Sequence, residues 1–532
     1  MHDRAGCHQI RPSHVVRHGG WYLAVVLLSM TLAFPTVLLA QVSTPTAAST
    51  PVIDTSDPRL ATIKPDLREQ VAARIGDTLS TYTIATTLVV GAHPGLNGKM
   101  PLDYVNMTGE ALEALPFRLY ANGADEEVDS IIVDDVTIDG ASVDPVLTVA
   151  NSVMTVPLAA PLPPQGRITI ELAFEATLPV DTSDHYGIFG IDTKTGSWAL
   201  AHWYPIVAGW DPANGWELDP TSVNGDPIFS NTALYDVTIT SPATWALVTT
   251  GSMVEDQVDG TKRTRHFLSG PVRDFTIVAD SDFQSLSTEV DGTTVTSWFN
   301  PGTERVGKAV LTYAAQSLAL YNTLIGPYPY LEFDIVPVEL YGAAGVEFPQ
   351  LIYIGQSYYA NNIVPDEPSY LNFTVSHEVM HQWWYGLVGN NQYVHAFTDE
   401  GLTNFISSKV YFSKISSEAF ADIIFMGAVQ SPFQTTVARG DDQIVDQPTD
   451  DFPSEGAYVF AVYSKAPMGF NAIYDEIGEE AFFAGLSAYY QEFMFGIAQP
   501  DDLRDAFAQA SGKDLTALWD HWFHQAAGAD DI

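Results

Sequence analysis

Residues 377–381 and residue 400 are of types that can together hold a zinc ion. The segment 377–381 reads H-E-V-M-H, and Glu400 follows it after eighteen intervening residues. On a helix, positions i and i+4 lie on one face, so His377 and His381 can share one tetrahedral Zn²⁺. Glu400 would complete a His₂Glu set and leave the fourth position open for water, as catalytic zinc sites do. Glu378 projects to the edge of the same face and is predicted to be the general base.

Two helices are expected to position these residues. The first is predicted from Ser369 to Tyr385, because this stretch has no internal Gly or Pro, Ser369 can be its N-cap, and glycines follow it. The second is predicted to begin at Thr398 as N-cap, with Glu400 in its first turn. Asp399 has two open interpretations. It could hold a histidine N–H behind the metal, or it could complement the dipole at a helix start.

The motif and its spacing resemble the aminopeptidase-N-like family of gluzincin metallopeptidases. In that family a Gly-Ala-Met-Glu-Asn segment precedes the zinc helix, and its Glu binds the free amine of the substrate. The matching segment here contains Gly345, Val346, Glu347 and Phe348. The resemblance implies substrate binding by Gly345, Val346 and Glu347, while Val346 and Phe348 depart from the family's Met and Asn. Taken from the residues alone, Glu347 could also be an ordinary exposed loop acid.

A segment downstream of the zinc motif extends the resemblance. The family's Tyr-x-Lys-Gly-Ala segment, whose Tyr steadies the oxyanion, corresponds to residues 463–467, which read Y-S-K-A-P. The resemblance therefore implies a catalytic role for Tyr463 and a structural charge at Lys465. Tyr458 is the alternative tyrosine, and one of the two is expected to pack in the core. Pro467 is expected in the first turn of a helix, where its missing N–H costs nothing.

The expected fold is a multidomain α+β structure. Short β-prone segments with turn signals fill residues 67–290, which predicts a β-rich, sandwich-like N-terminal domain. From 291 to 532 the pattern turns mostly helical, and the resemblance implies a thermolysin-like zinc catalytic domain there. Many family members continue into a further helical domain that covers the cleft, so an open cleft is expected in a chain that stops at Ile532. Three dipeptides are read as hairpin turns, namely Asn122-Gly123, Asp139-Gly140 and Asp259-Gly260.

A dense group of aromatic residues in the β-rich part has two open interpretations. Its members could line a pocket for a substrate side chain, or they could pack against one another under a loop. Family aminopeptidases have a Gln in this region that helps to hold the substrate amine, and no match to it is found here. The group consists of Trp198, Trp203, Tyr204, Trp210 and Trp216.

The N-terminal residues indicate export. Residues 1–20 contain three arginines, and residues 21–40 carry no charge. This pattern predicts either a cleaved signal peptide or a retained single-pass membrane anchor, and both place the catalytic part outside the cytoplasm. A linker is expected over residues 41–66. The single cysteine, Cys7, precedes the apolar run, so the exported part has no disulfide.

The charge of the chain limits its partners. It has 65 acidic against 23 basic residues and a net charge of -42. Such a surface repels phosphates, which argues against nucleic-acid binding, and it also repels anionic membrane surfaces. The charge is typical of a soluble extracellular protein, and no obligate protein partner is inferred.

These observations predict a zinc-dependent metallopeptidase with one Zn²⁺ per chain. The main hypothesis is an aminopeptidase that acts on peptides with a free N-terminus. One alternative is an open-cleft endopeptidase or oligopeptidase with the same zinc chemistry. The other is a catalytically inactive binding or scaffold protein of the same fold, against which the intact ligands, Glu378 and Tyr463 all argue.

Overall fold

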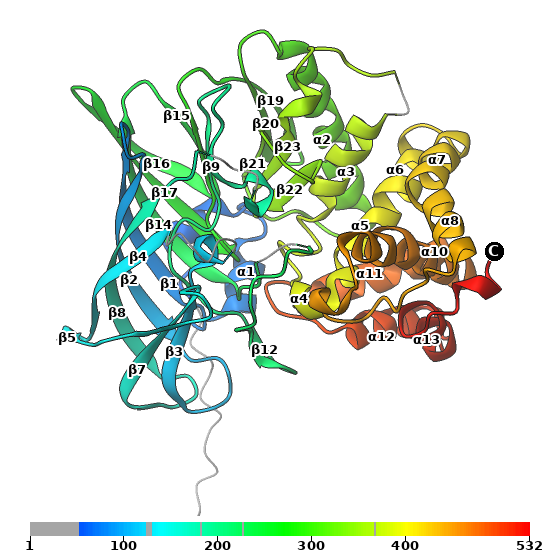
Figure 1. The fold of residues 1–532 in the computed structure, drawn as a ribbon, viewed down its shortest axis with the longest axis horizontal. Helices are drawn as coiled ribbons and strands as arrows, with labels where there is room; N and C mark the ends of the chain where they lie inside the picture. Colours follow the sequence, from blue (N-terminus) through cyan, green and yellow to red (C-terminus); the bar gives the residue numbers. More distant parts are fainter. Residues whose placement is uncertain (1–52, 124–129, 181–183, 226–227, 367–368) are drawn as a thin grey trace, which may run out of the picture. The chain divides into compact units, whose positions relative to one another are not determined.

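The computed structural model describes residues 53–123, 130–180, 184–225, 228–366 and 369–532 (Figure 1). The signal or anchor predicted over residues 1–40 lies outside this range. Among the helices of the described residues, none combines the length and apolar character that crossing a bilayer requires.

The largest element of the N-terminal part is an eight-stranded sheet in the order β16-β17-β14-β1-β2-β8-β4-β5. Strand β2 illustrates why it forms, because Leu96, Met100, Leu102 and Tyr104 alternate with exposed residues and put their side chains on one face. The strands are β1 (Thr81–Val89), β2 (Gly95–Val105), β4 (Ile131–Ile138), β5 (Ala141–Ser142), β8 (Arg167–Thr177), β14 (Ala233–Pro242), β16 (Ser252–Asp259) and β17 (Lys262–Val272).

Three smaller sheets complete this part. They run β15-β18-β10-β9, β11-β3-β7-β6 and β12-β13. Many of their buried residues share one core with those of the large sheet, while one side of the β15-β18-β10-β9 sheet packs in a second core with β21 (Glu332–Val338), β22 (Gly345–Phe348) and β23 (Leu351–Gly355). A β-rich N-terminal part is therefore confirmed. The strands are β3 (Leu112–Arg118), β6 (Val146–Thr148), β7 (Val153–Leu162), β9 (Phe189–Ile191), β10 (Trp198–Leu200), β11 (Ile206–Val207), β12 (Trp210–Asp211), β13 (Gly215–Trp216), β15 (Ala246–Thr249) and β18 (Ile277–Asp280).

Two of the three predicted turns are hairpins. Asp139-Gly140 joins β4 to β5 with φ of 48° and 80°, the positive values that a tight two-residue turn requires. Asp259-Gly260 lies at the turn between β16 and β17. The prediction at Asn122-Gly123 is wrong, because Asn122 ends the short helix η2 (Tyr120–Asn122) and its amide bonds the backbone of Ile131.

A five-stranded mixed sheet follows, in the order β19-β20-β21-β23-β22. The part from 291 onward is mostly helical, as predicted, but it begins with this sheet, which the sequence did not indicate. The boundary expected at 290 also falls inside a hairpin, since β19 and β20 pair across it. The strands are β19 (Gln284–Val290), β20 (Thr293–Phe299), β21 (Glu332–Val338), β22 (Gly345–Phe348) and β23 (Leu351–Gly355).

Helix α2 (Glu304–Leu324) links this sheet to the zinc-motif helix α3 (Tyr370–Met380). It buries one face at helical spacing, including Val306, Val310 and Tyr321, and it packs on β19, β20 and α3. The Tyr321 hydroxyl donates a hydrogen bond to the carbonyl of Ser376 within α3. The sheet and α2 thereby form a rigid support for the motif helix (Figure 1).

The remainder of the described chain is helical. Pro467 lies in the first turn of α10, as predicted, and the closing helices α12 and α13 bury Leu503, Phe507, Trp519 and Trp522. The α-helices are α4 (Gln392–His395), α5 (Glu400–Phe405), α6 (Tyr411–Ile415), α7 (Glu418–Phe425), α8 (Ser431–Arg439), α9 (Glu455–Phe460), α10 (Ala466–Ile477), α11 (Glu479–Phe493), α12 (Pro500–Ser511) and α13 (Thr516–Phe523). Three π-helical turns join some of them, namely η6 (Ile406–Val410), η7 (Met426–Gln430) and η9 (Ala461–Lys465).

The linker expected over residues 41–66 ends earlier than predicted. Leu60, in the short helix η1 (Pro58–Thr62), and Ile63 are fully buried, and the backbone of Lys64 bonds the carbonyl of Pro329. Residues 60–64 therefore pack against the segment around Pro329, which lies just before β21. Helix α1 (Arg68–Ile75) then leads into β1.

Candidate metal centre

Helix α3 begins as predicted and ends earlier than predicted. The Ser369 hydroxyl caps it by accepting a hydrogen bond from the Asn372 backbone N–H. The helix ends at Met380 instead of Tyr385, and His381 is its C-cap residue. His381 still has helical dihedral angles (φ -60°, ψ -13°), so the i, i+4 relation to His377 survives.

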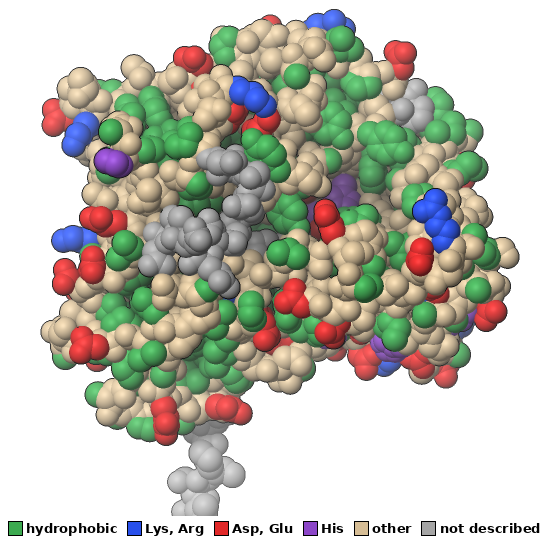
Figure 2. All heavy atoms as spheres, in the orientation of Figure 1, with side chains coloured by type: hydrophobic (Ala, Val, Ile, Leu, Met, Phe, Trp, Pro, Cys, Tyr) green, Lys and Arg blue, Asp and Glu red, His purple; other side chains and the backbone are tan. Residues whose placement is uncertain are grey.

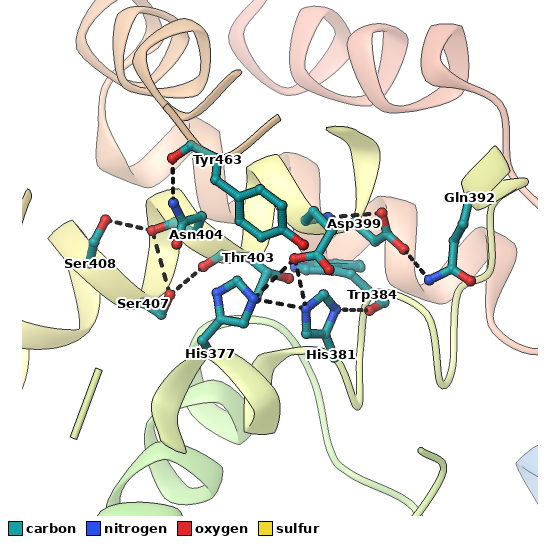
Figure 3. Close-up of polar contacts among 11 residues, drawn as sticks. His377, His381, Trp384, Gln392, Asp399, Thr403, Asn404, Ser407, Ser408 and Tyr463 are labelled. Carbon is teal, nitrogen blue, oxygen red and sulfur yellow. Dashed lines mark hydrogen bonds and ion pairs between the residues drawn. The ribbon is translucent and has the colours of Figure 1, made fainter. Parts of the chain in front are cut away.

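The three predicted ligands converge in one buried place. Nε2 of His377 lies 3.0 Å from Oε2 of Glu400 and 3.1 Å from Nε2 of His381, and the third edge of the triangle is 3.3 Å (Figure 3). A tetrahedral zinc ion, with bonds of about 2.0–2.1 Å, separates its ligand atoms by roughly 3.3 Å. The donor set and its spacing therefore fit zinc.

The charges within this triangle depend on one another. Burial lowers the pKa of His377, and the hydrogen bond to Glu400 only partly offsets this. Burial also acts to lower the pKa of His381, but the charge of Glu400, with Glu378 and Asp399 nearby, raises it to about 10. Burial alone would raise the pKa of Glu400, yet the two histidines hold it well below its usual range. The site therefore stabilises an ionised carboxylate beside a cation.

Glu400 enters from the first turn of α5. The predicted cap at Thr398 is wrong, since its hydroxyl donates to the carbonyl of His395. Asp399 is the N-cap and accepts from the Glu400 N–H and from the side chain of Gln392. The helix-start interpretation of Asp399 thus accounts for its contacts.

A backbone carbonyl fixes the orientation of the His381 ring. Nδ1 of His381 lies 3.1 Å from the carbonyl oxygen of Trp384, which accepts its hydrogen (Figure 3). In the neutral ring that can ligate a metal, the other nitrogen, Nε2, then presents its lone pair to the triangle. Sequence reasoning missed this partner because any residue can supply a carbonyl.

Gly345, Val346 and Glu347 lie on an edge strand, β22, and not in a loop. Glu347 is only 5% exposed, so the alternative of an exposed loop acid is wrong. Single ligand-type atoms of Glu347, Glu378 and His381 all lie within 4.8 Å of one another. A Cβ on Gly345 would come within 2.4 Å of Oε1 of Glu378. The glycine is therefore what allows the Glu378 carboxylate to approach this strand.

Tyr463 lies beside the ligands, on the π-helical turn η9. Its ring is nearly parallel to that of His377, with centroids 6.3 Å apart, and such turns are frequent at functional sites. The amide of Asn404 donates to the Tyr463 carbonyl at 2.6 Å. Sequence reasoning missed Asn404, although it follows Glu400 by four residues and so belongs to the same helix face.

The other residues of this segment have structural contacts. Tyr458 is buried and packs edge-on against Tyr463, and both line the cavity described next. The ammonium of Lys465 is fully buried and donates to Asp442 and to the carbonyls of Gln443 and Gln525. Lys465 thus joins three segments, as expected for a structural charge.

A cavity of about 450 Å³ opens above the triangle. Figure 2 shows histidine side chains at the bottom of a hollow with acidic side chains nearby. Of the described residues that line the cavity, four are carboxylates and none is Lys or Arg, so its field favours cationic groups. The carboxylates are Glu347, Glu378, Glu400 and Glu455.

The β-rich part contributes Tyr186 and Gly225 to this cavity, and the hydroxyl of Tyr186 donates to the Gly225 carbonyl. The aromatic group predicted between 198 and 216 lies elsewhere. Three of its members are buried, and Trp210 packs on Trp216 in a separate surface pocket. The packing interpretation of this group is therefore supported, and the pocket interpretation is wrong for the zinc cavity.

Comparisons with known proteins agree with this geometry. Residues 311–522 match the peptidase family M1 domain. The chain is 26% identical to Aminopeptidase 2 of Candida albicans over 285 residues, which are 50% of this chain and 29% of that protein. It is 22% identical to Aminopeptidase M1-A of Oryza sativa subsp. japonica over 380 residues, 68% of this chain and 41% of that protein. The matches thus span less than half the length of these relatives.

The fold has a counterpart among solved structures. An M1 zinc metallopeptidase from Deinococcus radiodurans superposes with a TM-score of 0.61 at 15% identity, covering 84% of this chain and 93% of that one. The similarity includes both the β-rich and the helical parts, since it extends well beyond the matched domain. Residues 311–522 therefore contain a peptidase family M1 domain, and the motif, the fold and the relatives all support a similarity of the chain to the aminopeptidase-N-like gluzincin family.

Proposed function

We propose that the protein is a zinc-dependent aminopeptidase that hydrolyses N-terminal residues from peptides. One observation carries the proposal. The His377, His381 and Glu400 donor atoms form a triangle of zinc-site dimensions at the bottom of a cavity in which Glu378 and Glu347 face the same histidine. The relatives named above bear aminopeptidase names, which agrees with this assignment.

His377, His381 and Glu400 would hold the metal. When bound, a zinc ion supplies Lewis-acid polarisation of the scissile carbonyl and a lowered pKa for the attacking water. Glu378 takes the proton of that water and passes it to the leaving amine, a general acid–base role for which its buried position beside His381 is suited. Gly345 keeps the space into which the Glu378 carboxylate projects.

Tyr463 stabilises the oxyanion that develops on the carbonyl oxygen. Its side chain reaches the cavity, its ring packs along His377, and its backbone is held by Asn404. A donor fixed in advance in this way acts without reorganisation during the reaction.

Glu347 binds the α-ammonium of the substrate. Its carboxylate is buried within 4.8 Å of a Glu378 oxygen, and two acids so close favour a cationic group between them. A mutant of the Deinococcus radiodurans enzyme was crystallised with a Tyr-Ser-Ala substrate. A peptide with a charged N-terminus is the substrate class that we assign to this cavity.

An open-cleft endopeptidase with the same zinc chemistry is the second candidate. It is favoured by one observation, that no Gln is found among the described residues that line the cavity. The uncharged run 21–40 after three arginines supports an extracytoplasmic location for either activity.

The first prediction concerns the metal. The purified protein should hold about one Zn²⁺ per chain, and His381→Ala should lose it, because two remaining ligands do not hold zinc tightly. Metal analysis after dialysis measures this. His524→Ala, which alters a surface histidine paired with Asp520, should keep the zinc. A stoichiometric ion in His381→Ala would place the metal elsewhere.

The second prediction concerns the base. Glu378→Gln should keep zinc and lower kcat by about 10²- to 10⁴-fold, because no group then accepts the proton of the water. Gly345→Ala should lower kcat less strongly, since its methyl group displaces the same carboxylate. Steady-state kinetics beside metal analysis measures both. Glu480→Gln, on the surface of α11, is the control, and a normal kcat in zinc-loaded Glu378→Gln would reject the role.

The third prediction separates two tyrosines. Tyr463→Phe should lower kcat by roughly a hundredfold with little change in KM, because its hydrogen bond forms mainly in the transition state. Tyr458→Phe is the matched variant in the same cavity and should leave kcat within a few-fold. The reverse pattern would assign the oxyanion role to Tyr458.

The fourth prediction tests chain-end selection. Glu347→Ala should depress kcat/KM on free-amine peptides by roughly a hundredfold or more, since it removes a charge-assisted hydrogen bond. N-acetylated peptides should be poor substrates of the wild type and lose little further in the variant. If the wild type cleaves blocked peptides internally and Glu347→Ala slows both substrates equally, the protein is an endopeptidase.

A further inference from the structure

Two buried ionisable residues lie directly after β17, where the chain crosses from the eight-stranded sheet to β18. Arg273 and Asp274 are 2% and 3% exposed. Neither residue lines the zinc cavity, and the proposed mechanism does not use them. Such a pair is costly to bury and requires partners, so its contacts indicate what it does.

Arg273 joins three segments that are distant in sequence. Its guanidinium donates to the carbonyls of Ser230, Tyr385 and Gly496. A Cβ on Gly389 would come within 2.2 Å of the Arg273 Cζ, so the guanidinium lies directly on the backbone that follows the zinc helix. Burial lowers the pKa of Arg273 to about 10, so it remains a cation at neutral pH.

Asp274 holds the same loop through a side chain. Its carboxylate accepts a hydrogen bond from the Tyr385 hydroxyl. Tyr385 is buried and has a φ of 101°, a conformation that a bulky residue adopts only when its surroundings impose it. Arg273 on the carbonyl and Asp274 on the hydroxyl thus fix Tyr385 at two points.

This loop is the one that orients a zinc ligand. Trp384, the neighbour of Tyr385, supplies the carbonyl that accepts the Nδ1 hydrogen of His381, and the Gly386 N–H bonds the His381 carbonyl. The groups that accept the second nitrogen of a ligating histidine set its tautomer and ring orientation. A shift at Tyr385 would therefore move the His381 ring.

We propose that Arg273 and Asp274 are positioning residues for the metal ligand His381, acting through the strained Tyr385 loop. This inference rests on the proposed zinc site and assigns to the β-rich part a share in forming it. The expected consequence is a loss of zinc affinity when the hydrogen bonds of Arg273 and Asp274 to Tyr385 are broken, although no zinc ligand is removed.

The test measures zinc affinity by chelator competition in the full-length protein. Tyr385→Phe removes one oxygen and leaves the ring in place, and Asp274→Ala removes its acceptor. Each should raise the zinc Kd by about tenfold or more, the range found for groups that support metal ligands. The double variant should be no worse than the weaker-binding single variant, because both break the same hydrogen bond.

Two matched variants separate positioning from general destabilisation. Asp334 is half-buried, burial raises its pKa and that of Asp274 to about 7, and it accepts from the Trp298 indole at 2.7 Å. Tyr490 is buried and donates to the Pro327 carbonyl at 2.8 Å. Asp334→Ala and Tyr490→Phe should lower the melting temperature as the test variants do, and should leave the zinc Kd unchanged.

The outcomes are distinguishable. Wild-type zinc affinity in both test variants overturns the positioning role alone, and so does an equal loss of affinity in the two control variants. Tyr385→Phe should give a native circular dichroism spectrum, which keeps the test valid if Asp274→Ala folds poorly. A wild-type protein that binds no zinc overturns the proposed function and this inference together.

Discussion

A carboxylate held between two imidazoles, within about 3.3 Å of both and largely away from water, is the constraint on which the rest of the site depends. Such a group cannot stay ionised inside a protein without a cation beside it. Without a metal, the neighbouring carboxylates raise the pKa of His381, so that a proton on this ring can supply the charge. The spacing of the donor atoms also fits a zinc dication.

The elements around the triangle divide this task between local and distant parts of the chain. Helix α3 sets the spacing of the two histidines, and α5 carries Glu400 in its first turn and Asn404 in the next. One short helix therefore holds both a metal ligand and the residue that bonds the Tyr463 backbone. On the other side, the edge strand β22 approaches closely at Gly345, so that the base and the proposed amine-binding acid converge on one histidine.

The sequence predicted what depends on local spacing. The i, i+4 histidines, the Ser369 cap and the position of Pro467 all follow from rules that operate within one helix, and the structure agrees with them. The spacing to Glu400, on a second helix, was expected from the resemblance to a known family. The sequence could not predict that α3 ends at Met380. The helix ends there because of tertiary contacts around Tyr385, and not because of a Gly or Pro inside the helix. Strand β22 was missed for a similar reason, since four residues become a strand only by pairing with β23.

The contacts that sequence reasoning missed also show that the site is built from residues on both sides of the predicted domain boundary at residue 290. The loop that orients His381 is held by the Arg273 guanidinium, which also binds the backbone near residues 230 and 496. Tyr186 and Gly225 come to the cavity from the β-rich part as well. The described residues from 53 onward accordingly form one compact unit. The conformation at Tyr385 would be unfavourable in isolation, and the partners that impose it lie more than a hundred residues earlier in the chain. Zinc-ligand geometry in this protein is thus a property of the β-rich and helical parts together, although all three ligands come from the helical one.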